Sequence, residues 1–212
     1  MDVLLFDLDN TLYPPERELF ALIDVRINRF MREQVGIPAD RVDGLRRDYW
    51  QAYGVTLQGL IRHHGVDPED YLHYVHDVDV AARLAPDPAL RAMLAALPQR
   101  KAVFTNGSTC HADRVLAALG VADQFEAVFD IRVADYLPKP RPEPYQAVLA
   151  ALGAAPERCM MIEDSRDNLR TAKALGMTTV LVGDGATPAF VDLHLPGVHA
   201  LGPALSLAEA AS

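Results

Sequence analysis

The sequence is poor in cysteine and has no long apolar run. Its two cysteines, Cys110 and Cys159, lie far apart and lack the spacing of a zinc site, so we expect free thiols in a reducing compartment. No segment approaches the ~20 consecutive apolar residues that cross a bilayer. The first apolar run, Val3–Phe6, is too short for a signal peptide. We therefore expect a cytoplasmic protein with no membrane partner.

Positive charge is also scarce. The 212 residues include 20 Lys and Arg against 29 Asp and Glu, which gives a formal net charge of −9. This balance argues against a general affinity for nucleic acid or for anionic membranes. An anionic substrate would need locally placed positive charge, from a metal or from a few basic side chains. Hydrophobic residues make up 50% of the chain and charged residues 23%, as in a globular protein.

Short apolar segments recur along the chain with predicted helices between them. Val3–Phe6 is apolar throughout, as in a strand buried on both faces of a parallel sheet. Similar segments occupy residues 101–104, 127–129, 159–162 and 178–182. Strands joined by single helices predict right-handed crossovers and an α/β fold with a doubly wound parallel sheet.

Residues 15–83 show helical periodicity and no strand signal. Between residues 19 and 31, apolar side chains recur every three or four positions, as on an amphipathic helix. Three more helices are predicted, at about 39–53, 57–64 and 68–76. We therefore predict a Rossmann-like core formed by residues 1–14 and 84–212, and an inserted α-helical domain at 15–83.

Polar side chains cluster where predicted strands end. They are Asp7, Asp9, Thr105, Asn106, Glu163 and Asp164. Ligands of doubly wound sheets bind beyond the carboxyl ends of the strands, so these side chains should share one site. Lys139 lies in a proline-rich loop that can reach them. Asp, Asn and Thr also form turns and helix caps, which is the alternative interpretation for any one of them.

Asp7 and Asp9 lie two residues apart, so at a strand end both carboxylates project to the same side. Their repulsion is relieved by a metal, a proton, or both. Phosphoryl transfer needs a nucleophile, neutralisation of phosphate oxygens and a proton for the leaving oxygen. Asp7 is the candidate nucleophile through an aspartyl-phosphate. Asp9 is the candidate acid and base.

Mg²⁺ is the expected cofactor, held by Asp7, the main-chain carbonyl of Asp9 and Asp164. Lys139 would supply a second positive charge against the phosphate and the nucleophile. The Thr105 hydroxyl and the Asn106 main-chain amide are suited to hold phosphate oxygens. Such an oxygen site accepts Mn²⁺ as well as Mg²⁺.

Four segments together resemble the motifs of the haloacid dehalogenase superfamily. They are Asp7-Leu8-Asp9-Asn10-Thr11, Thr105-Asn106-Gly107, Lys139-Pro140 and Glu163-Asp164-Ser165. The resemblance implies that the helical insertion is a cap over the active site, and it adds Gly107 to the substrate-binding residues. Many members carry a second Asp where this chain has Asn168, so one negative charge is missing beside the metal.

A narrower similarity to the pyrimidine 5'-nucleotidases rests on residues 9–14, 53–60 and 139–145. It implies hydrolysis of nucleoside 5'-monophosphates. Three alternatives stay open: a phosphatase or mutase for another small ester such as a sugar phosphate or phosphoglycolate, a haloacid dehalogenase, and a non-catalytic phosphate-binding module. We expect a small phosphorylated partner and a monomer or homodimer. Candidate contacts for the rest of the substrate are Tyr13, Tyr49, Tyr53, Arg62, His63 and His64.

Overall fold

The computed structural model describes residues 1–210, with side chains up to Leu207. Its centre is a six-stranded sheet in the order β3-β2-β1-β4-β5-β6, in which all neighbours are parallel. The strands are β1 (Val3–Phe6), β2 (Arg100–Phe104), β3 (Ala127–Phe129), β4 (Cys159–Glu163), β5 (Thr178–Val182) and β6 (Leu193–Leu195). The predicted doubly wound parallel sheet is confirmed, and β6 is a further strand that the sequence analysis did not predict.

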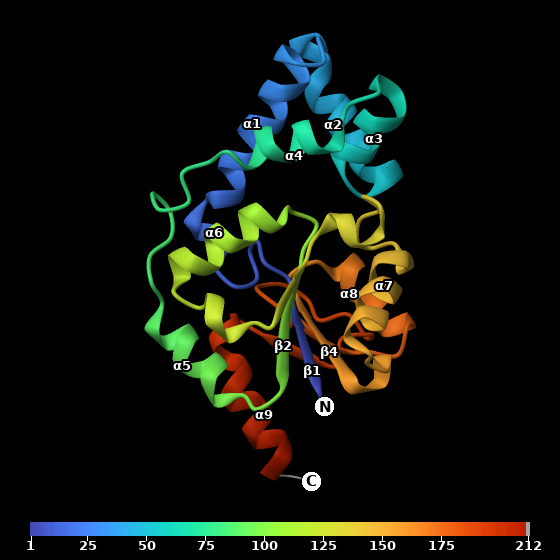
Figure 1. Ribbon diagram of the computed structural model, residues 1–212. Coiled ribbons are helices and arrows are strands. Elements are labelled where there is room, and N and C mark those ends of the chain that lie inside the picture. The colour runs from blue at the N-terminus through green and yellow to red at the C-terminus, as the bar shows by residue number, and fades with distance from the viewer. Residues whose placement is uncertain (211–212) are drawn as a thin grey trace.

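Helices cover both faces of the sheet (Figure 1). One face carries α5 (Pro88–Ala96), α6 (Thr109–Leu119) and α9 (Leu201–Ala210), and the other carries α7 (Pro142–Leu152) and α8 (Arg166–Ala174). Because β1 alternates its side chains, Leu4 and Phe6 pack with the first set and Val3 and Leu5 with the second. Five 3₁₀ helices complete the described secondary structure: η1 (Pro15–Arg17), η2 (Ala122–Gln124), η3 (Ile131–Ala134), η4 (Pro156–Arg158) and η5 (Val198–Ala200). Across residues 1–210, no helix combines the length and the apolar character needed to traverse a bilayer.

Four consecutive helices pack together beyond the carboxyl ends of the strands (Figure 1). We call them the helical block: α1 (Leu19–Glu33), α2 (Ala39–Tyr53), α3 (Thr56–His64) and α4 (Pro68–His76). Their buried apolar side chains, among them Ile27, Phe30 and Leu60, form a core of their own. The helical block falls within the segment predicted as an inserted domain, while the boundaries of that domain stay a prediction.

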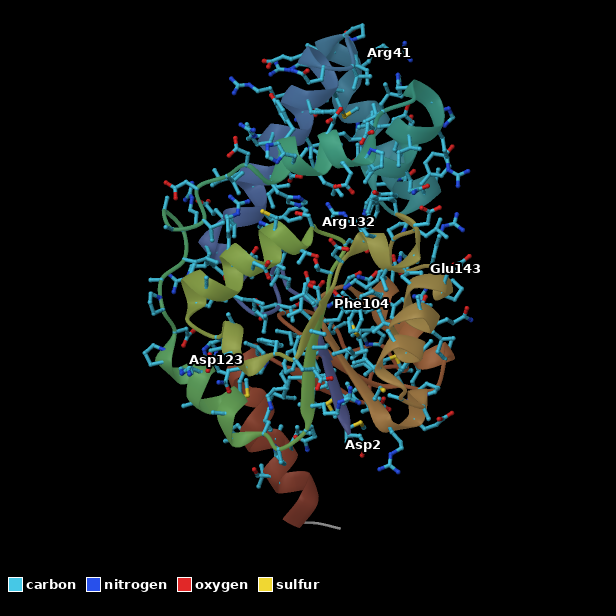
Figure 2. The ribbon with its side chains drawn as sticks, in the orientation of Figure 1. Asp2, Arg41, Phe104, Asp123, Arg132 and Glu143 are labelled. Atoms are coloured by element: carbon cyan, nitrogen blue, oxygen red, sulfur yellow. The ribbon has the colours of Figure 1, made fainter. Side chains whose placement is uncertain are left out.

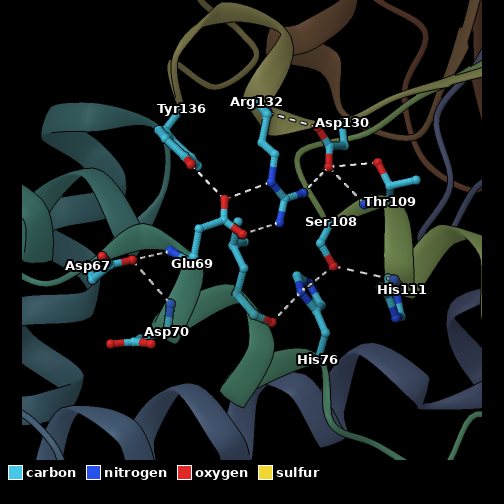
Figure 3. A network of polar contacts seen from close by, with 11 residues as sticks. Asp67, Glu69, Asp70, His76, Ser108, Thr109, His111, Asp130, Arg132 and Tyr136 are labelled. Carbon is cyan, nitrogen blue, oxygen red and sulfur yellow. Dashed lines mark hydrogen bonds and ion pairs between the residues drawn. The ribbon is translucent and has the colours of Figure 1, made fainter.

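An ion-pair network joins α4 to the loop after β3. The Glu69 carboxylate accepts hydrogen bonds from the Arg132 guanidinium at 2.7 and 2.6 Å and from the Tyr136 hydroxyl at 2.6 Å (Figure 3). Arg132 also pairs with the buried Asp130, and it lies between the helical block and the sheet (Figure 2). The hydrogen bonds from Arg132 and Tyr136 lower the pKa of Glu69 to about 2. The network therefore holds one face of α4 against the sheet side of the molecule.

Two glycines of the helical block offer a matched test of its packing. A Cβ at Gly59 in α3 would lie 2.1 Å from the ring of Tyr49, whereas a Cβ at Gly44 in α2 would meet nothing within 4 Å. Gly59→Ala should lower the free energy of unfolding by about 1–3 kcal/mol because it overpacks the core. Gly44→Ala should raise it by about 0.5–1 kcal/mol because glycine is costly inside a helix. Chemical denaturation measures both values, and equal shifts would contradict the packing of α2 on α3.

Candidate active site

The carboxyl ends of β1, β2 and β4 bring together side chains from distant parts of the chain. Lys139 lies between two carboxylates, with its Nζ 2.7 Å from Oδ1 of Asp7 and 2.9 Å from Oε2 of Glu163. It also donates to the main-chain carbonyl of Phe104 at 2.7 Å. An ammonium group has three donors, and these contacts use all three. Lys139 is 1% exposed, so the ion pairs are removed from solvent.

The loop that carries Lys139 is held by Asn106. The Asn106 Oδ1 accepts the main-chain N–H of Lys139 at 2.8 Å, and its Nδ2 donates to the main-chain carbonyl of Lys139 at 3.0 Å. This side chain therefore orients the lysine. The predicted phosphate contact through the Asn106 main-chain amide stays a prediction.

Thr105 and Gly107 form a local turn beside the site. The Thr105 hydroxyl accepts the Gly107 N–H at 2.9 Å, and both residues line the cavity described below. A hydroxyl that accepts one bond keeps its own proton for another acceptor, such as a phosphate oxygen. The Gly107 N–H is occupied in this arrangement, so Thr105 is the better placed donor of the two.

Glu163 ends β4 and is fixed on both oxygens. Its Oε1 accepts the main-chain N–H of Ser165 at 3.1 Å, and its Oε2 accepts from the Asn168 amide at 3.0 Å. Asn168 thus serves to orient Glu163. Asp164 is half-buried and accepts from the Thr11 hydroxyl at 3.4 Å.

Negative charge exceeds positive charge in this cluster. One oxygen from each of Asp7, Glu163 and Asp164 lies within 4.8 Å of the others. Burial raises the pKa of all three carboxyl groups, and Lys139 opposes this rise. Three carboxylates and one ammonium leave two uncompensated negative charges, which suit a divalent cation that prefers oxygen ligands. The predicted ligands Asp7 and Asp164 belong to this cluster, Glu163 is a further carboxylate within it, and the predicted contact through the Asp9 carbonyl stays a prediction.

Asp9 lies beside the cluster and has partners of its own. Its Oδ1 accepts from Nε2 of His111 at 2.8 Å and from the Tyr13 hydroxyl. Burial would raise the pKa of Asp9, but His111 and Tyr13 outweigh burial and lower it. Tyr13, predicted as a substrate contact, is 2% exposed and is instead a buried partner of Asp9.

A cavity of about 720 Å³ is lined by the strand-end residues and by the helical block. Of the residues proposed to contact the rest of the substrate, Tyr53 lines it. The Tyr49 ring instead stacks on that of His63, with 5.4 Å between centroids. Tyr49, His63 and His64 line a different cavity. Arg62 is placed over the Tyr53 ring, 5.2 Å from its centroid.

A family model for haloacid dehalogenase-like hydrolases matches residues 1–176. The chain belongs to this family. Phosphate metabolism protein 8 of Saccharomyces cerevisiae is 29% identical over 196 residues, which are 84% of this chain and 60% of that protein. The chain therefore spans less than two thirds of the yeast relative. A phosphoglycolate phosphatase of Rhodospirillum rubrum is 30% identical over 199 residues, 86% of this chain and 79% of that protein.

Two solved structures share the fold. CbbY from Rhodobacter sphaeroides in complex with phosphate gives a TM-score of 0.68 at 22% identity and covers 95% of this chain and 96% of its own. The L-2-haloacid dehalogenase of Xanthobacter autotrophicus gives a TM-score of 0.64 at 18% identity, and the match covers 97% of this chain and 98% of that protein's chain. At these identities the likeness supports the fold alone, and a fold shared by both proteins does not decide the reaction.

Several residues of this haloacid dehalogenase-like site were missed by sequence reasoning. They are Phe20, Trp50, His76 and His111. A usable signal existed for His111, because it stands three residues after Ser108, the N-cap of α6. The first turn of a helix that follows a strand lies at the carboxyl edge of the sheet, where the site is. Phe20, Trp50 and His76 carried no comparable signal, since they reach the cavity only through the packing of the helical block.

Lys139→Met should lower the free energy of unfolding by about 3–5 kcal/mol, because it leaves Asp7 and Glu163 buried without their cation. Lys173→Met is the matched control. Lys173 contacts Asp192 at 2.6 Å, but the two side chains are 41% and 36% exposed. This change should cost less than about 1 kcal/mol. Chemical denaturation at neutral pH measures both, and a similar small loss for the two variants would contradict the buried ion pairs.

Proposed function

We propose that the chain is a Mg²⁺-dependent phosphomonoester hydrolase that acts through an aspartyl-phosphate on Asp7. The observation that carries the proposal is the buried contact of Lys139 with Asp7 and Glu163, beside Asp164. A phosphate dianion can approach a carboxylate only when positive charge offsets their repulsion. Lys139 provides one such charge, and the excess of carboxylates suits a second.

In the proposed reaction, an Asp7 oxygen attacks phosphorus while the bond to the leaving oxygen breaks. Asp9 enters the step protonated on Oδ2, the oxygen that His111 and Tyr13 do not contact, donates that proton to the leaving oxygen, and regains one from the water that hydrolyses the acyl phosphate. The Thr105 hydroxyl and the Asn106 main-chain amide bind phosphate oxygens. Mg²⁺, when held by Asp7, Asp164 and the carbonyl of Asp9, neutralises charge on the phosphate.

The wall of the cavity favours a nucleoside 5'-monophosphate. The helical block contributes the side chains of Phe20 and Trp50, which are 41% and 61% exposed, together with Tyr53. Accessible aromatic rings can stack on a planar base. Apart from His76, the described residues that line the cavity from the helical block include no basic side chain. A leaving group that is planar and uncharged therefore suits this wall.

Phosphoglycolate is a second candidate. It is favoured by relatives such as the Rhodospirillum rubrum protein, which is named a phosphoglycolate phosphatase. The carboxylate of such a substrate needs a cationic partner. The described residues that line the cavity include three basic side chains, those of Lys139, His76 and Arg141. Of these, Arg141 is the one available to pair with such a carboxylate. It lies on the sheet side, two residues after Lys139.

A panel of phosphate esters distinguishes these substrates. Phosphate release is measured from UMP, CMP, sugar phosphates and phosphoglycolate, with Mg²⁺ and after chelation. We expect kcat/KM for UMP and CMP to exceed that for phosphoglycolate by at least about tenfold, because the described residues on the helical-block side of the cavity offer no Lys or Arg to pair with the carboxylate of phosphoglycolate. Release should stop when Mg²⁺ is removed.

Other outcomes would change the proposal in defined ways. The reverse ranking, abolished by Arg141→Ala, would replace the nucleotide with phosphoglycolate. Full activity after chelation would contradict the metal site. Release from none of the esters would contradict the phosphatase proposal, and turnover of a 2-haloacid would then establish a dehalogenase.

A further inference from the structure

The end of α4 touches the first turn of α6 beside the reaction site. His76, the last residue of α4, is buried, and its ring stacks on that of His111 with 4.8 Å between centroids and 18° between planes. Its Nδ1 lies 3.0 Å from the carbonyl of Leu72 and 3.1 Å from the hydroxyl of Ser108 (Figure 3). A carbonyl only accepts, so this nitrogen carries the proton. A residue of the helical block is thereby fixed on α6.

His111 directs its side-chain hydrogen bond at Asp9. The ring is fully buried, its Nε2 lies 2.8 Å from Oδ1 of Asp9, and its Nδ1 has no partner within the described structure. A carboxylate accepts hydrogen bonds, so Nε2 is the donor. A buried imidazole with one unsatisfied nitrogen is costly compared with an apolar side chain. The contact with Asp9 is what histidine provides here and an apolar residue would not.

Two donors converge on one oxygen of Asp9. The Tyr13 hydroxyl and the His111 ring are both bonded to Oδ1. Among the residues whose side chains are described, no hydrogen bond reaches Oδ2. Asp9 also lines the cavity. The two donors therefore orient the carboxylate and leave Oδ2 for the substrate.

We propose that His111 is a positioning residue for Asp9 and that His76 fixes His111, so that Asp9 is aligned when α4 lies against α6. The inference rests on the proposed function, in which Asp9 exchanges a proton with the leaving oxygen. The ion pair of Glu69 with Arg132 anchors the same helix closer to its beginning (Figure 3). Placement of the helical block and orientation of the proton donor are then a single event.

A purely structural role for His111 makes a different prediction. If its ring only filled the core under α6, replacing it would lower stability and depress activity on every substrate alike. Positioning of Asp9 acts on proton transfer. An alkyl alcohol needs a proton as it departs, whereas p-nitrophenolate does not. The dependence of the loss on the leaving group separates the two roles.

The test compares His111→Leu with His111→Gln, whose amide nitrogen can occupy a place near that of Nε2. Each full-length variant is assayed with Mg²⁺ on an alkyl phosphate and on p-nitrophenyl phosphate, and its thermal unfolding is measured. We expect His111→Leu to lower kcat/KM, which reports the steps up to departure of the leaving group, about 100-fold on the alkyl phosphate and less than about threefold on p-nitrophenyl phosphate. His111→Gln should regain at least about tenfold of the loss.

Two further comparisons link the effect to Asp9 and to α4. Adding His111→Leu to Asp9→Asn should cause no additional loss on the alkyl phosphate, because both changes remove the same step. His76→Phe keeps an aromatic ring but removes the contact with Ser108, and should reproduce the dependence on the leaving group. His73→Phe, at an exposed position of the same helix, should retain the wild-type kcat on both esters.

Equal losses of kcat/KM on the two esters, or additive losses in the double variant, would overturn the positioning role of His111. Wild-type behaviour of His76→Phe on both esters would overturn the link to α4. If the wild-type protein hydrolysed neither ester, the proposed function itself would fail, and the inference with it. If the wild-type enzyme hydrolyses both esters, the proposed function stands, and the variants then test the role of His111 alone.

Discussion

The ammonium of Lys139 is the interaction on which the rest of the site depends. It binds Asp7 after β1, the carbonyl of Phe104 at the end of β2 and Glu163 at the end of β4, so one buried charge joins three strands. Removing an ion from water costs several kcal/mol, and only well-placed partners offset that cost. Asn106 holds the loop of Lys139 from one side. The result is a carboxylate, the proposed nucleophile Asp7, held in a fixed place next to more negative charge than the lysine can neutralise.

The helical block adds to this arrangement the walls of a cavity and a second set of polar contacts. Its aromatic side chains Phe20 and Trp50 face a space whose opposite side is formed by carboxylates and by Lys139. The ion pair of Glu69 with Arg132 and the stacking of His76 on α6 anchor α4 at two places. Enclosure of the cavity and orientation of Asp9, the proposed acid and base, are therefore consequences of the same packing.

The strand-end residues could be predicted from the sequence because topology alone places them together. Parallel strands share one carboxyl edge, so apolar runs followed by Asp7, Thr105 and Glu163 were sufficient. The cavity wall could not be predicted in this way. Trp50 and Tyr49 are adjacent in α2, yet Tyr49 is 7% exposed and Trp50 61%. Helical spacing does not decide which of two neighbours faces the core, and the contact between α4 and α6 exists only once both helices are placed.

The role of Asp7 is tested most directly by identifying the residue that carries the phosphoryl group during turnover. Enzyme mixed with a good substrate and Mg²⁺ is quenched in acid within milliseconds, digested, and analysed by mass spectrometry, with Asp7→Asn treated in parallel. If Asp7 is the nucleophile, one phosphoryl group is added to the peptide that contains Asp7, and none is added in the variant. A phosphoryl group on another residue, or rapid hydrolysis without any covalent adduct, would contradict Asp7 as the nucleophile.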